Sequence, residues 1–162
     1  QNGFKNLFKE KWFISTNCNL CSEENIEIIN SIWRKFGSKT ITMKPKDHDS
    51  IMAITSHIPH LIAYNIVGTA SELEENIKSE VIKFSASGFR DFTRIASSDP
   101  VMWRDIMLSN KDEIISLLDK FNNDLKQIID AIKKDNGEFL VKKFQKTREI
   151  RKKIVEAGLD KN

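Results

Sequence analysis

The sequence predicts a mainly α-helical fold preceded by a small β-α-β segment. Two runs of β-forming residues flank one amphipathic helix near the N-terminus, and from residue 45 onward nearly every segment repeats its apolar residues at helical spacing. A chain of 162 residues is long enough for one domain, or for one domain and part of another. We therefore expect two parts, residues 1–44 and residues 45–162.

The N-terminal part is predicted to form strand, helix and strand. Residues 11–16 and 39–43 are rich in β-formers. Between them, Ser22 can cap a helix whose first turn is acidic, and Gly37 is a suitable stop. The apolar stripe of this helix consists of Ile26, Ile29, Ile32, Trp33 and Phe36. A β-α-β unit belongs on a parallel sheet, and this one is too small to bury a core alone, so we expect it to need a partner sheet.

The first half of the helical part is predicted to be interrupted. Residues 47–67 form one amphipathic stretch, which Pro59 must kink or deprive of a hydrogen bond. The segments expected next are a break at 68–71, a helix over 72–84, a turn of small residues at 85–88 and a helix over 90–96.

The second half is predicted to contain the longest helices. Asp99 and Pro100 have the pattern of a cap and an early-helix proline, opening a helix over 101–108. The longest helix begins at Asn110 and stops at 135–137, and a last helix covers 138–157, ended by Gly158. Antiparallel long helices with a broad apolar stripe indicate bundle packing and, in a chain of this size, a dimer interface.

Composition favours an ordinary soluble protein. The net charge is +3, with 40% hydrophobic and 30% charged residues. The basic run at 142–153 alternates with apolar residues and is interpreted as a solvated helix face, so we expect no nucleic-acid partner. No apolar run is long enough to cross a bilayer, and no signal-peptide core begins the chain. We expect a cytoplasmic protein and, because the chain opens without methionine, the middle of a longer one.

The two cysteines, Cys18 and Cys21, lie between a predicted strand and a helix, where a redox pair would lie. No aromatic residue precedes Cys18, and the downstream chain becomes helical. A single Cys-x-x-Cys without a second ligand pair is also weak evidence for zinc. A reducing compartment is the default for so few cysteines.

Ser56, His57 and His60 lie one turn apart around Pro59. Histidine exchanges protons near neutral pH, so this concentration indicates a site for a small molecule. Buried structural histidines are an alternative, and His-x-x-His could also hold a metal, although no third ligand is evident. The proline favours a site, because it frees backbone groups and re-aims side chains.

Arg90, Asp91 and Arg94 also lie about one turn apart. Asp91 can orient one arginine and leave the other to bind a carboxylate with both nitrogens. A solvated cluster of ion pairs is the alternative interpretation.

Two long motifs resemble those of the prephenate/arogenate (cyclohexadienyl) dehydrogenase family. Residues 53–60 (AITSHIPH), preceded by His48-Asp49, resemble the family's HD…A-x-x-SHLPH helix. Residues 88–96 (GFRDFTRIA) and 98–103 (SDPVMW) resemble its GFRDxTRIA…SDPxMW segment. The early runs 3–8 and 12–16 resemble the late part of the family's nucleotide-binding domain.

This resemblance implies a homodimeric oxidoreductase. Its members combine a Rossmann domain that binds NAD or NADP with a helical domain that dimerises. They oxidatively decarboxylate prephenate or arogenate in tyrosine biosynthesis, and some admit tyrosine as an inhibitor. Residues 1–44 would be the end of the Rossmann domain, and residues 45–162 the substrate-binding and dimerisation domain.

By resemblance, Arg94 would bind a substrate carboxylate, and His60 and Ser56 would contact the substrate. Asp91 would orient Arg94 or His60, Trp103 would wall the pocket, and His57 and Arg90 are further candidates.

Two family features are missing from this sequence. It contains no G-x-G-x-x-G turn, and the family's catalytic histidine would precede Gly3. We therefore expect no catalytic residue here, no turnover by this chain alone, and a dinucleotide bound mainly outside it. The alternative is a stand-alone helical dimerisation or aromatic-ligand-binding module without chemistry.

Overall fold

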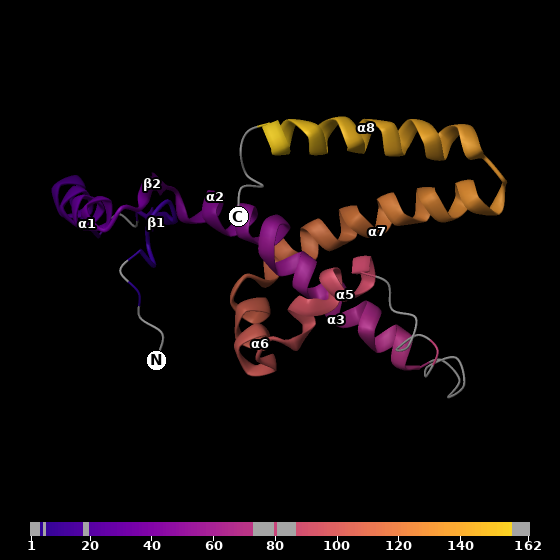
Figure 1. The fold of residues 1–162 in the computed structure, drawn as a ribbon, viewed down its shortest axis with the longest axis horizontal. Coiled ribbons are helices and arrows are strands. Elements are labelled where there is room, and N and C mark those ends of the chain that lie inside the picture. The colour runs from indigo at the N-terminus through magenta and orange to yellow at the C-terminus, as the bar shows by residue number, and fades with distance from the viewer. Residues whose placement is uncertain (1–3, 5, 18–19, 73–79, 81–86, 157–162) are drawn as a thin grey trace. The chain divides into compact units, whose positions relative to one another are not determined.

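A computed structural model describes residues 4, 6–17, 20–72, 80 and 87–156 of the chain (Figure 1). The chain divides into two compact units, Gln1–Ile115 and Ser116–Asn162. The boundary falls inside one long helix, so each unit is described by itself.

The N-terminal segment forms the predicted β-α-β unit. Strands β1 (Trp12–Thr16) and β2 (Lys39–Met43) pair in parallel, with Trp12 opposite Lys39 and Thr16 opposite Met43. Helix α1 (Glu23–Lys35) connects them. The side chain of Ser22 accepts a hydrogen bond from the backbone of Asn25, and Gly37 follows the helix at φ 88°, a conformation that favours glycine. The predicted cap and stop are thus confirmed.

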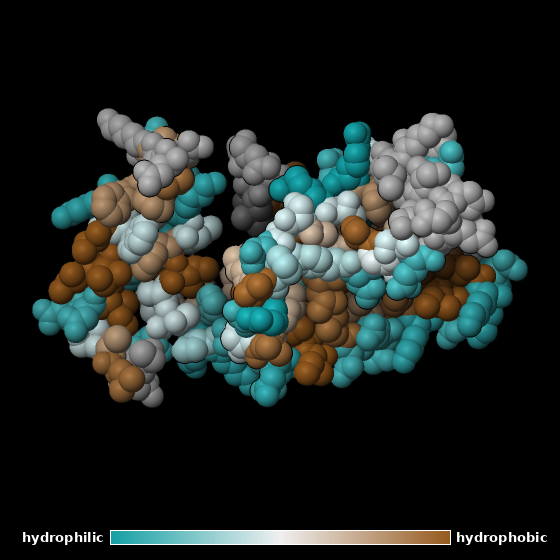
Figure 2. All heavy atoms as spheres, turned by 90° about the horizontal axis from the view of Figure 1, so that it is seen from below, coloured by the Kyte–Doolittle hydropathy of each residue, from teal (hydrophilic) through white to brown (hydrophobic). Residues whose placement is uncertain are grey.

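Helix α1 packs on the two strands through both aromatic and polar contacts. The ring of Trp33 stacks on Phe13 at 4.7 Å. Beside it, buried Asn30 accepts from Ser15 and donates to Thr42, which are bonded to each other at 2.9 Å. Other apolar side chains of this segment remain exposed, and hydrophobic atoms gather on its surface at the left of Figure 2. They include Trp12, Ile29, Phe36 and Ile41. The segment therefore leaves much of its apolar surface uncovered.

The interruption predicted at Pro59 takes the form of a π-helix. Helix α2 (Pro45–Met52) continues into the π-helical segment η1 (Ala53–His57) and then into α3 (Ile58–Ser71). The backbone N–H of Ile58 bonds to the carbonyl of Ala53, five residues back. Pro59 lacks an N–H and its ring crowds the preceding turn. A wider turn just before it accommodates both effects without ending the helix.

The predicted break at 68–71 is wrong, because α3 runs through Gly68 to Ser71. A glycine inside a helix costs only about 1 kcal/mol, which neighbouring bonds can offset. Ser71 Oγ donates back to the carbonyl of Gly68 at 2.7 Å. The helix predicted over 72–84 falls almost entirely outside the described residues.

Three short helical segments follow. They are α5 (Ser87–Thr93), the 3-10 segment η2 (Arg94–Ser97) and α6 (Pro100–Ser109). The predicted small-residue turn is wrong at Ser87 and Gly88, which already belong to α5, and residues 85–86 lie outside the description. The predicted cap at Asp99 is confirmed, because its carboxylate accepts from the backbone N–H of Met102 at 2.8 Å.

The two longest helices form an antiparallel hairpin. Helices α7 (Lys111–Lys133) and α8 (Gly137–Glu156) run side by side (Figure 1). Asp135 adopts φ 50° at the turn, and Asn136 Oδ1 accepts from the backbone of Phe139. Much of the predicted apolar stripe of α7 remains about 40% exposed or more, at Phe121, Leu125, Ile129 and Ile132. Gly158, the predicted end of the last helix, is not described.

None of the described helices combines the length and apolar character needed to cross a membrane.

Candidate functional site

All three histidines of the chain lie on the continuous α2–η1–α3 path. His60 bonds through Nδ1 to the backbone carbonyl of Ser56 at 2.9 Å. A carbonyl only accepts, so Nδ1 of His60 carries a proton. The free nitrogen of neutral His60, Nε2, is therefore an acceptor.

Trp103 of α6 joins the two histidines of the motif. Its indole stacks on His60 at 3.6 Å between ring centroids, with 21° between the planes, and meets His57 edge-on at 6.3 Å. Trp103 is only 7% exposed, and its indole N–H has no hydrogen-bond partner among the described residues. The expected wall is thus in place against both imidazoles, with one donor left unsatisfied.

His57 is bonded differently. Its Nδ1 lies 3.2 Å from the side-chain nitrogen of Asn110, which also donates to the backbone carbonyl of Asp49 at 2.8 Å. Partial burial lowers the pKa of His57 below its ordinary value. The charges of His48 and His60 lower this pKa further, while the Asp49 carboxylate opposes them. His57 is therefore held mainly neutral at physiological pH.

Sequence reasoning missed the bonding role of Asn110, for which it had predicted only a helix start. It lies between α6 and α7, and its bonds reach residues 53 and 61 positions away. Nearby, Ser50 Oγ donates to Glu113 Oε2 at 2.8 Å, and His48 Nδ1 contacts Asp49 Oδ1 at 3.0 Å. No periodicity or local motif signals contacts across such separations.

The arginine segment differs, because its charged side chains are exposed. Arg90 and Asp91 lie on α5, and Arg94 is the first residue of η2. Within the part of the chain that the structure describes, no ion pair links any of these three. The expected pairing of Asp91 with an arginine is thus not formed.

The backbone of the arginine segment is nevertheless anchored to α3. The hydroxyl of Tyr64 donates to the carbonyl of Ser98 at 2.5 Å, and α3 packs against α5 and η2. Thr93 Oγ1 donates to the carbonyl of Phe89 at 2.7 Å. The two motifs are therefore brought to neighbouring elements of one unit, although no described hydrogen bond joins the arginines to the histidines.

No three histidine, cysteine, aspartate or glutamate side chains gather to hold a metal within the described ranges. Cys18 falls outside those ranges, and Cys21 is exposed just before α1.

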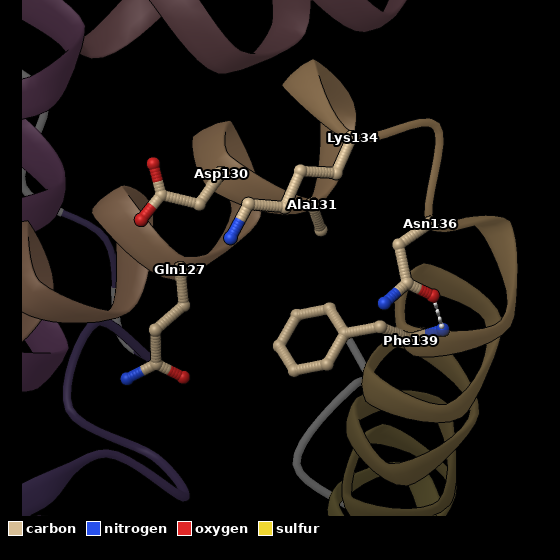
Figure 3. Close-up of a pocket in the computed structure, with 6 residues that line it drawn as sticks. All are labelled: Gln127, Asp130, Ala131, Lys134, Asn136 and Phe139. Atoms are coloured by element: carbon tan, nitrogen blue, oxygen red, sulfur yellow. Dashed lines mark hydrogen bonds between the residues drawn. The ribbon is translucent and has the colours of Figure 1, made fainter.

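The described cavities do not contain the expected residues. One of about 320 Å³ opens beside Asp49 and Asn110 and is lined by side chains of both charges. Another, of about 230 Å³, lies at the turn between α7 and α8, where the ring of Phe139 points toward α7 (Figure 3). The latter is a hollow in the helical hairpin and carries no histidine or arginine.

Comparisons with known proteins address the motifs directly. Residues 44–146 match the family model described as prephenate dehydrogenase, dimerization domain. The chain is 36% identical to the cyclohexadienyl dehydrogenase of Zymomonas mobilis over 149 residues, covering 92% of this chain and 51% of that protein. It is 32% identical to the prephenate dehydrogenase of Bacillus subtilis, covering 90% and 39%. The chain thus spans about half the length, or less, of these relatives.

The fold agrees with solved structures of the same kind. The prephenate dehydrogenase of A. aeolicus, in complex with hydroxyphenyl propionate and NAD+, matches with a TM-score of 0.84 and 31% identity, over 92% of this chain and 52% of that one. The arogenate dehydrogenase of Synechocystis matches with a TM-score of 0.82 at 23% identity, over 91% and 54%, which supports the fold alone. With both motifs, the fold and the family model in agreement, this chain belongs to the prephenate dehydrogenase dimerization-domain family.

Proposed function

We propose that this chain supplies the substrate-binding side chains and the dimer core of an NAD(P)-dependent prephenate or arogenate dehydrogenase. The observation that carries this proposal is the cluster of His57, His60 and Trp103, built by a family-matching domain beside an anchored arginine segment. We further propose that the division into an α/β part and a helical part lies at residue 44. The family match begins there, and α2 starts one residue later.

The residues of this chain do not fit a complete dinucleotide site. The sequence has no G-x-G-x-x-G turn, and the connection that precedes α1 contains no glycine. The β-α-β unit has uncovered apolar surface that a larger sheet would bury. We infer that NAD or NADP is bound mainly by residues outside this chain, and no chemical step is assigned to it here.

The expected roles of the side chains follow from their bonding. Arg94 is exposed and carries no described carboxylate partner, so its planar fork is available for a substrate carboxylate. His60 presents Nε2 as an acceptor for a substrate hydroxyl, and Ser56 offers its half-buried hydroxyl one turn away. Trp103 packs against His60 and keeps water from one face of that imidazole. Arg90 and Asp91 adjust the charge around Arg94.

Dimerisation and feedback are parts of the same proposal. The exposed apolar side chains of α7 would be covered by a second copy of this domain. Tyrosine shares the aromatic ring and a carboxylate with the products of such a reaction, so the arginine segment could also bind it as an inhibitor.

The test compares the chain alone with a completed enzyme. The chain would be joined to the part of the Zymomonas mobilis relative that lies outside the match, and NAD(P)H absorbance would be followed with prephenate and with arogenate. We expect turnover by the fusion and none by the chain alone. Turnover by the chain alone would refute the inference that the base lies elsewhere. A folded fusion that neither turns over nor binds either substrate would refute the proposed function.

A further inference from the structure

Asn110 occupies a position from which one amide group bridges two distant backbone segments. It is half-buried between α6 and α7 and is the C-terminal cap residue of α6. Its Nδ2 lies 2.8 Å from the carbonyl oxygen of Asp49 in α2 and 3.2 Å from Nδ1 of His57 in η1. Both contacts are within hydrogen-bond distance.

The orientation of this amide is determined by the Asp49 carbonyl. A backbone carbonyl can only accept a hydrogen bond, so the amide nitrogen, and not the amide oxygen, must face it. Rotating the amide by half a turn would place two oxygens against each other. The usual ambiguity in assigning an asparagine side chain is thereby resolved on chemical grounds. Each of the two amide hydrogens then has one acceptor.

The amide orientation in turn determines where His57 carries its proton. Because Asn110 donates to Nδ1, that nitrogen must be unprotonated, and the proton of neutral His57 lies on Nε2. A doubly protonated ring would set two N–H groups against each other. The charged or titratable groups that face His57 are His48, Asp49 and His60, whereas Trp103 and Asn110 contribute no charge from α6 and its C-terminal cap.

His60, one helical turn away, carries the opposite arrangement. Its Nδ1 donates to the carbonyl of Ser56, so its neutral form leaves Nε2 bare. The two imidazoles of the motif therefore differ in what they can present to a ligand: His57 presents a donor and His60 an acceptor. This difference also disfavours a shared metal ion, because Nε2 of His57 holds a proton where a metal would bind.

We propose that Asn110 is a positioning residue that fixes His57 as the neutral Nε2–H tautomer, opposite to the tautomer of His60. The assignment of the tautomer stands on the geometry alone. That the resulting donor–acceptor pair faces an oxygen-bearing substrate rests on the function proposed above. Lowering of the His57 pKa by burial and by His48 acts in the same direction.

Long-range proton–nitrogen NMR correlation on the uniformly ¹⁵N-labelled chain tests this directly, because the sequence has only three imidazoles. Spectra would be recorded above the ordinary histidine pKa and assigned with single His→Gln variants. We expect the Nε2–H pattern for His57 and the Nδ1–H pattern for His60. A His57 that carries its proton on Nδ1, or that averages both forms as a solvated imidazole does, would overturn the proposal.

Asn110→Ala is the matching variant. We expect the single-tautomer pattern of His57 to be lost and its pKa to move up toward the ordinary value, while the pattern of His60 is kept. Asn65→Ala is the control, because Asn65 is exposed on α3 and contacts only Thr69 through its side chain. An unchanged His57 in Asn110→Ala would overturn the proposal. If that variant fails to fold, the wild-type spectrum still decides. None of these readings depends on substrate, so a failure of the proposed function would leave them intact and distinguishable.

Discussion

The histidine segment and the arginine segment carry motifs of similar length, yet they are built in opposite ways. In the α2–η1–α3 path, His48, His57 and His60 each bond through Nδ1 to a specific neighbour, and Trp103 is buried against two of them. In α5 and η2, the guanidinium groups are exposed and form no described ion pair. One region is organised before any ligand arrives, and the other is organised only in its backbone.

This difference separates two ways of contributing to binding. Preorganised groups lose little conformational freedom when a ligand arrives, whereas a free arginine loses side-chain entropy on pairing. The histidine segment should therefore contribute to folding as well as to binding. The arginine segment should contribute to binding alone.

The largest expected effect is on stability at Trp103. Trp103→Ala should lower the free energy of unfolding by about 3–5 kcal/mol, because it empties a buried site and removes the stack on His60. Trp12→Ala is the matched control, since Trp12 is 58% exposed and should cost much less. Urea unfolding followed by circular dichroism measures both. Equal losses at the two positions would mean that the histidine segment is not the better-packed region.

A smaller effect, confined to binding, is expected at Arg94. In the fusion enzyme, Arg94→Ala should weaken transition-state binding by about 1.5–3 kcal/mol through loss of a charge-assisted carboxylate contact. The measurement is kcat/KM, together with the unfolding curve, which should not move. Arg104→Ala provides the control, because Arg104 is also exposed but is paired with its neighbour Asp105. An unchanged kcat/KM in Arg94→Ala would remove Arg94 from the site.

The smallest effect is a pH dependence of stability at His57. Its pKa is lower in the folded chain than in the unfolded chain, so the unfolded state binds more protons in the interval between the two values. The contribution to stability is complete above the ordinary histidine value of about 6.5 and is lost as pH falls from there to the folded pKa. Urea unfolding of the wild type and His57→Gln across this interval should show a steeper loss in the wild type. Parallel curves would show that His57 is not held neutral.

The sequence predicted the elements whose signals are local. Ser22, Gly37 and Asp99 cap or end helices through neighbours within four positions, and the two strands have the composition of β-formers. The helix through Gly68 was missed because local propensity is weaker than continuity of the helix. The π-helix was missed because a proline signals an irregularity but not its form.

The site was only partly predictable for a related reason. Motif resemblance identified the residue types, including Trp103, but the bonding of Asn110 with Asp49 and His57 joins parts of the chain too far apart for any spacing rule. The expected ion pair of Asp91 failed because helical spacing permits such a pair without requiring it. Exposure of both partners then leaves water as the competing ligand.

The π-helix at Ala53–His57 makes the chain sensitive to its own residue count. A π turn holds one residue more than an α turn, so deleting one residue there would restore a regular helix and rotate everything after it by about 100° relative to α2. His60 and Tyr64 would then leave Trp103 and the Ser98 carbonyl, while His48 and Asp49 kept their places. In this segment, length is therefore as strict a requirement as chemical identity: a substitution removes one contact, whereas a single-codon deletion would misalign the whole of α3.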